Sequence, residues 1–145
     1  MRTSSTRHGD ALRGLDEDDA FIALLIAAME AGGHTSAEEA ARAHHMIWSM
    51  RRFRHRSGDA VGRKIGRLRV MIERHGTPAV IDASAKKIPI RLRRAAFAIA
   101  ADLVLVDSRM DRSEKRFLEG LAVNLRLRSD TARRILDVIR TKNSA

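Results

Sequence analysis

Apolar residues recur along this chain at intervals of three and four, which is the spacing of one face of an α-helix. The clearest case is Val61, Ile65, Leu68 and Ile72, which follow one another at steps of four, three and four. Gly or Pro separates several of the patterned segments, and these residues commonly mark helix ends and helix starts. The pattern predicts seven helices, at about 16–30, 35–53, 59–75, 77–86, 89–106, 111–125 and 129–140.

Two of the predicted helices, 16–30 and 89–106, carry apolar residues on almost every side. A helix of that kind is usually buried, so we expect both in the core and place 89–106 at its centre. The sequence therefore predicts an all-α fold, a compact bundle of about seven helices in a single domain over residues 16–142. Because helix, polar turn and capped helix occur at 20–50 and again at 95–125, two helical-pair repeats are a further hypothesis.

The first 15 residues are polar and show no periodicity, which predicts a disordered N-terminal tail at 1–15. This segment lacks the apolar centre of a secretory signal. The longest apolar run, residues 20–29, is about half of the roughly 20 residues that a membrane span requires. The chain has no cysteine, which excludes disulfides and thiolate metal sites and fits a reducing compartment. We therefore expect a cytoplasmic location.

Charge is concentrated in the middle of the chain. The formal net charge is +10, yet residues 51–94 alone hold 14 Lys and Arg against three acids. Such a surface attracts anionic partners, either nucleic acid or an anionic membrane, or else it is only a solvated helix face. Trp48 and Phe53 are the only nearby aromatic residues that could stack on bases, and both fall at core spacing. The candidate anionic-partner surface consists of Arg51, Arg52, Arg63, Lys64 and Arg67.

A second candidate site is the acidic turn between the predicted helices 89–106 and 111–125. Asp111 and Glu114 have the spacing of a capping box, in which each side chain accepts from the other's backbone amide. Together with Asp107, the same carboxylates could instead bind a divalent cation such as Ca²⁺ or Mg²⁺. The spacing differs from that of a calcium loop, and Arg109 would oppose a bound cation. Both interpretations stay open here.

The stretch from Ala98 to Leu118 reads Ala-Ile-Ala-Ala-Asp-x4-Asp-Ser-x-Met-Asp-x-x-Glu-x-x-Phe-Leu. It resembles the TerB-like family of small all-helical proteins associated with tellurite resistance, and the resemblance covers roughly residues 90–142. The family turn reads Asp-Gly-x-apolar-polar-x-x-Glu, so it falls on Asp107, Ser108, Met110, Asp111 and Glu114, with Ser108 in place of the family's Gly. The resemblance implies that these acids are metal ligands, as proposed for the family.

No nucleophile–base arrangement, phosphate-binding Gly-rich loop or cofactor motif stands out, so we expect no enzymatic activity. The resemblance implies a non-catalytic module associated with stress and tellurite resistance, which acts by binding a protein partner. A protein that binds nucleic acid or an anionic membrane through its basic surface is the alternative. Monomeric and dimeric forms both fit this sequence.

Overall fold

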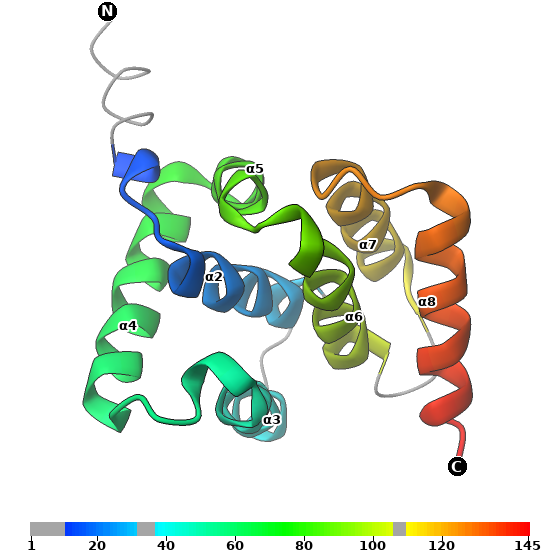
Figure 1. Ribbon diagram of the computed structural model, residues 1–145, viewed down its shortest axis with the longest axis horizontal. Helices are drawn as coiled ribbons and strands as arrows, with labels where there is room; N and C mark the ends of the chain where they lie inside the picture. Colours follow the sequence, from blue (N-terminus) through cyan, green and yellow to red (C-terminus); the bar gives the residue numbers. More distant parts are fainter. Residues whose placement is uncertain (1–10, 32–36, 106–109) are drawn as a thin grey trace, which may run out of the picture.

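The computed structural model describes residues 11–31, 37–105 and 110–145, and these parts of the chain contain helices and no strands. The all-α bundle of about seven helices is confirmed (Figure 1). The long helices are α2 (Glu17–Glu30), α3 (Ala37–Ser49), α4 (Gly58–His75), α5 (Thr77–Lys87), α6 (Arg93–Val104), α7 (Arg112–Asn124) and α8 (Ser129–Lys142). Two short 3₁₀ turns, η1 (Arg51–Phe53) and η2 (Ile90–Leu92), precede α4 and α6.

Helix α2 forms the centre of the bundle, because every residue from Asp19 to Met29 is buried. It packs against α3, α4, α5 and α6, and Figure 1 shows these helices arranged around it. The sequence pattern had favoured α6 for this position. Helix α6 buries residues such as Phe97 and Ala100, but Arg94 and Ala95 are exposed, so only part of its surface faces the core.

Helices α7 and α8 complete the bundle beyond α6. Both pack on α6, and α7 also reaches α5, so the acidic turn connects two helices that share one core. The largest side chains buried here are Phe97, Leu118, Leu121 and Leu125. Helices α2 and α3 also pack against each other, as do α6 and α7. The duplicated helical pair nevertheless stays a hypothesis.

Several predicted helix ends are confirmed, and others lie at different residues than predicted. The Ser57 hydroxyl accepts from the Ala60 amide and caps α4, which begins within one residue of its predicted start. Helix α5 begins at Thr77, its predicted first residue, and Gly76 takes the capping position. Gly76 has φ 83° and ψ 149°, a backbone conformation that is open almost only to glycine. This backbone reversal lets α5 begin directly after α4 ends.

Three other boundaries differ from the sequence-based prediction. Helix α3 ends at Ser49, because Met50 has an extended backbone that bends the chain into η1. The predicted tail at 1–15 is too long, since Leu12 and Leu15 are buried in the core. Helix α8 continues to Lys142, two residues further than expected. Among the helices of the described residues, none combines the length and apolar character needed to cross a membrane.

Candidate functional site

The acidic turn supplies the cap of α7. The Asp111 carboxylate accepts from the Glu114 amide at 2.8 Å, and the Glu114 carboxylate accepts from the Asp111 amide at 3.4 Å. The predicted capping box is therefore present, and each side chain uses one oxygen in it. Asp107 and Arg109 lie outside the described residues. Within the described ranges, no group of three or more His, Asp or Glu side chains converges as metal ligands would.

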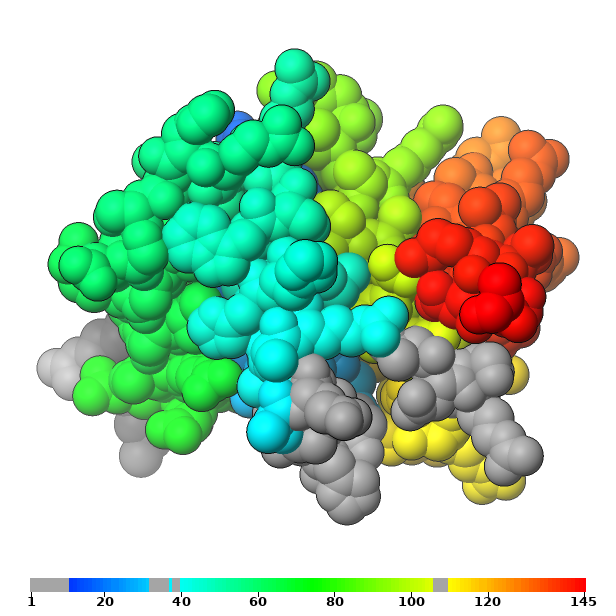
Figure 2. All heavy atoms as spheres, turned by 90° about the horizontal axis from the view of Figure 1, so that it is seen from below, coloured from blue at the N-terminus to red at the C-terminus, as the bar shows by residue number. Residues whose placement is uncertain are grey.

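Asp102, on the preceding helix, anchors the end of the chain. Its carboxylate lies 2.9 Å from the Lys142 ammonium and accepts from the Asn143 side-chain amide at 3.1 Å. These contacts fix the end of α8 to α6. Asp102 also lines a hollow of about 620 Å³ between α3 and α8, which is visible on the face shown in Figure 2. Its position is explained by this structural role.

Three of the five residues of the predicted anionic-partner surface are held in ion pairs by the acidic start of α2. The Arg52 guanidinium lies 2.8 Å from Asp18 and 3.2 Å from Glu17. The Lys64 ammonium and the Arg67 guanidinium lie 3.0 and 2.6 Å from the same oxygen of Asp19.

Arg51 and Arg63 are exposed and form no ion pair within the described residues. Two of the five predicted residues thus carry a charge that no acid of the described residues pairs with.

A buried carboxylate organises this network, which we call the α2 ion cluster: Asp16, Glu17, Asp18, Asp19, Arg52, Arg56, Lys64 and Arg67. Asp16 and Asp19 form a capping box in which the Asp19 amide donates to Asp16 at 2.7 Å. This box places Asp19 inside the bundle, where it is only 1% exposed. Unpaired, a carboxylate in that position would be strongly destabilising, and Lys64 and Arg67 supply the opposite charge.

The pKa values of the cluster follow from these contacts. Burial raises the pKa of Asp16, but hydrogen bonds from the Asp19 amide and from Lys64 outweigh burial, and the net pKa is lowered. Burial lowers the pKa of Lys64, but hydrogen bonds to Asp19 and Asp16 outweigh burial, and the net pKa is raised. Both groups are therefore held in their charged forms. The Arg52 guanidinium also lies 4.4 Å from the centre of the Phe21 ring, a cation–π contact.

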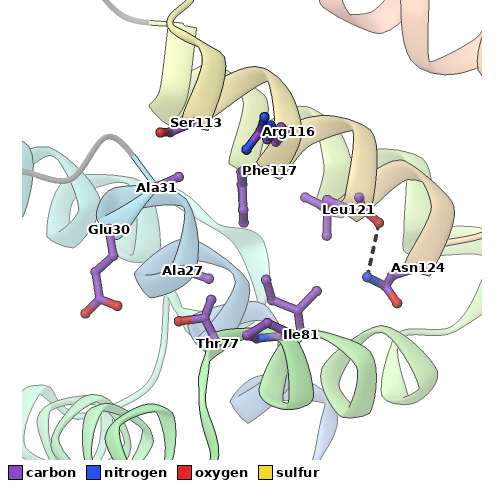
Figure 3. A pocket seen from close by; sticks show the side chains of 12 residues that line it. Ala27, Glu30, Ala31, Thr77, Ile81, Ser113, Arg116, Phe117, Leu121 and Asn124 are labelled. Carbon is purple, nitrogen blue, oxygen red and sulfur yellow. Dashed lines mark hydrogen bonds between the residues drawn. The ribbon is translucent and has the colours of Figure 1, made fainter.

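A groove that sequence reasoning did not identify lies between α2, α5 and α7 (Figure 3). Its volume is about 400 Å³. Apolar side chains from all three helices form its walls: Ala27 from α2, Ile81 from α5, and Phe117 and Leu121 from α7. Polar and charged side chains also line it: Glu30, Thr77, Ser113, Arg116 and Asn124.

Small residues keep this groove open. Ala27 and Ala31 line it on α2, and Gly120 lines it on α7. A Cβ atom at Gly120 would meet nothing within 4 Å, so the space beside it is empty of protein. Ser113 and Arg116 come from the first turns of α7, which Asp111 caps. The groove therefore begins directly beside the acidic turn.

Comparisons of this chain with protein-family models, curated proteins and solved structures find no match.

Proposed function

We propose that this protein is a TerB-like, non-catalytic interaction module, and that the groove between α2, α5 and α7 holds a segment of a partner protein. The observation that carries the proposal is the groove itself, which combines apolar walls with charged residues at its edge. Its volume of about 400 Å³ lies within the range of binding sites for small ligands and anchoring side chains. The resemblance of residues 90–142 supports the association with tellurite and stress.

The chemistry of the lining specifies the partner segment. Phe117 is partly buried and offers an apolar surface to aliphatic side chains, as grooves do that receive one face of an amphipathic helix. Ile81 and Leu121 line the groove as core residues. Glu30 and Arg116 carry opposite charges, and neither forms an ion pair within the described residues. The proposed partner is therefore an amphipathic helix with aliphatic anchors and an acidic residue that meets Arg116.

Gly120 allows a direct test, because a larger side chain there would fill the groove from an exposed helical position. A library of randomised amphipathic helical peptides is screened for binding to the intact protein. The affinities of the enriched peptides are then measured for the natural chain and for its variants. We expect peptides with aliphatic anchors and an acid, whose affinity falls by at least about tenfold with Gly120→Leu. Gly66→Leu is the matched control, since Gly66 is also an open, exposed helical glycine.

Two results would contradict the groove as the binding site. The first is a selection that enriches no peptide, and the second is affinity that falls equally in both variants. Arg116→Glu adds an independent measurement, because it should weaken the acidic peptides and leave the fold unchanged. Exposed positions of this kind tolerate charge reversal well.

The proposal includes a divalent cation at the acidic turn, held by Asp107, Asp111 and Glu114. The capping box uses one oxygen of the Asp111 carboxylate, and carboxylate oxygens are the ligands that Ca²⁺ and Mg²⁺ prefer. Titration calorimetry with either cation should show saturable binding that is lost in Asp107→Ala. Absence of heat with the intact protein would remove the cation from the proposal and leave the groove unaffected.

The association with tellurite is tested separately in cells. Deletion of the gene should lower survival on tellurite, and unchanged survival would remove this part of the proposal.

A further inference from the structure

The 3₁₀ turn η2 presents an isoleucine to solvent. Ile90 is 82% exposed, whereas Ile88 before it is 1% exposed and Leu92 after it packs against the core. The Arg93 guanidinium donates to the Ile88 carbonyl at 3.1 Å, and Pro89 restricts the backbone between them. The turn is therefore fixed on both sides, and the exposed Ile90 side chain lies between these two anchors.

Cations flank Ile90 along the chain. Residues 83–101 contain five Lys and Arg and no acidic residue. Lys86 pairs with Asp82, and Arg93 is used in the turn. Lys87, Arg91 and Arg94 are exposed and form no ion pair within the described residues. Their charge is thus available to an outside partner, in contrast to the cations of the α2 ion cluster.

Arg94 extends this surface to α8. It lines a groove of about 490 Å³ between α6 and α8, together with Arg134 and the Thr131 hydroxyl. Ala95, Ala98 and Ile135 line the rest of the groove, and no carboxylate lines it. Two guanidinium groups and a hydroxyl from two helices supply the donors that a phosphate group accepts from. The groove opens one helical turn after Ile90 along the chain.

We propose that these residues form a docking site for a bilayer that contains anionic phospholipids. This lipid surface consists of Lys87, Ile90, Arg91, Arg94, Thr131 and Arg134. Ile90 enters the interface between headgroups and acyl chains, and a lipid phosphate binds between Arg94 and Arg134. An exposed aliphatic side chain within a basic patch is typical of proteins that lie on a membrane. This site differs from the η1 and α4 residues that the charge pattern first indicated, and it is independent of the proposed peptide groove.

The composition of the surface favours lipid over nucleic acid. Proteins that bind single strands without sequence preference stack bases on aromatic rings, and the lipid surface contains no aromatic residue. The chain's single tryptophan, Trp48, lies on α3. An isolated exposed isoleucine gains nothing from a phosphate backbone, but it is stabilised when it enters an apolar phase.

The test is co-sedimentation of the full chain with phosphatidylcholine vesicles, with and without phosphatidylglycerol. We expect binding only to the mixed vesicles, weakened by salt. Ile90→Ala should lower the partition coefficient about tenfold, because it removes aliphatic groups that the bound protein buries in the bilayer. Ile90→Leu should restore the partition coefficient. Arg94→Gln and Arg134→Gln should each lower it about fivefold, the loss expected for one cation near an anionic surface.

Matched variants separate this site from general surface properties. Val123→Ala removes another exposed aliphatic side chain, and Arg63→Gln removes another exposed cation that forms no ion pair within the described residues. Both should bind vesicles like the natural chain. Equal losses in these controls would contradict a defined lipid surface. Because Ile90 is already exposed, its variants should have the same midpoint of thermal unfolding as the natural chain. Circular dichroism measures this midpoint.

Two further titrations distinguish other anions. Inorganic phosphate that binds through Arg94 and Arg134, without vesicle binding, would identify a soluble phosphate ligand and overturn the proposal. A single-stranded oligonucleotide that binds in preference to mixed vesicles and quenches Trp48 fluorescence would overturn it in favour of nucleic acid. Absence of partitioning into the mixed vesicles would also overturn it. The proposal is supported if phosphate and the oligonucleotide both bind weakly and the protein partitions into mixed vesicles in a way that depends on Ile90.

Discussion

Asp19 is a buried carboxylate whose surroundings could not be foreseen from its neighbours in the chain. The sequence shows four acids at 16–19 before an apolar helix, a pattern that favours the helix dipole. The partners of Asp19 lie 45 and 48 residues further along, at Lys64 and Arg67. Only the packing of α2 against α4 brings these groups together. The available signal was the opposite charge of two segments, the acids at 16–19 and the cations at 63–67.

Substitution of Asp19 tests whether the cluster stabilises the fold. Asp19→Asn removes the charge that neutralises Lys64 and Arg67 and replaces two charge-assisted hydrogen bonds with weaker contacts. We expect the free energy of unfolding to fall by about 2–3 kcal/mol, measured by urea denaturation. The loss stays below that of a fully buried pair, because both cations can turn toward solvent. Asp82→Asn, in an exposed pair with Lys86, is the control and should cost at most about 0.5 kcal/mol.

Asp111 distinguishes a cap from a metal ligand. As a cap alone, Asp111→Ala should lower the free energy of unfolding by about 1 kcal/mol, with or without divalent cation. A residue that also binds a cation would show a larger loss when the cation is present, since ligand binding stabilises the native state. Ser57→Ala, at the cap of α4, is the matched control and should be indifferent to the cation. Urea denaturation with chelator and with Ca²⁺ measures both effects.

Helix positions were more predictable than the faces that the helices bury. Repeating apolar residues located α4 and α7 to within a residue or two, and Asp111 caps α7 through the predicted capping box. Helix α3 was harder, since its sequence offers Ala, His, Met and Trp on several sides. Trp48 was expected in the core but is 38% exposed. Small residues such as Ala43 face inward there instead, which allows α3 to approach α2.

Core truncations in α6 and α7 should destabilise the whole bundle, including α3, where Trp48 lies. Phe97 and Leu121 come from α6 and α7, and both are at most 1% exposed. Phe97→Ala and Leu121→Ala should each lower the free energy of unfolding by about 2–5 kcal/mol, from lost burial and the cavity left behind. Urea denaturation with both circular dichroism and tryptophan fluorescence should give coincident transitions. A transition in which Trp48 reports later than the helices would indicate that α3 unfolds separately.

The whole molecule distributes its charge in a way that composition alone does not reveal. The excess of cations at 51–94 suggested one continuous basic surface. Folding neutralises part of it, because Arg52, Lys64 and Arg67 pair with the start of α2. Lys87, Arg91 and Arg94 near Ile90 belong to the same excess. No pattern in the sequence distinguishes these cations from the paired ones. The groove between α2, α5 and α7 was also unpredictable, since it arises from three separate helices.

The α2 ion cluster should make stability depend on pH at both extremes. Asp16 has a folded pKa below its ordinary value of 3.8, so its contribution is complete above that value and is lost as pH falls through the folded pKa. Lys64 has a folded pKa above its ordinary value of 10.5, so its contribution is complete below that value and is lost as pH rises through the folded pKa. Stability due to these two groups should therefore be constant between these limits.

Variants assign each limit to its residue. The difference in free energy of unfolding between the natural chain and Asp16→Asn should be constant at neutral pH and should shrink below pH 3.8, where the unfolded carboxylate gains a proton before the folded one does. The corresponding difference for Lys64→Met should shrink only above pH 10.5, where the unfolded ammonium loses its proton before the folded one does. Urea denaturation across the pH range measures both. A difference for Asp16→Asn that begins to shrink well above pH 3.8 would contradict the lowered pKa, because it would mean that the carboxylate takes up its proton more easily in the folded chain than in the unfolded one.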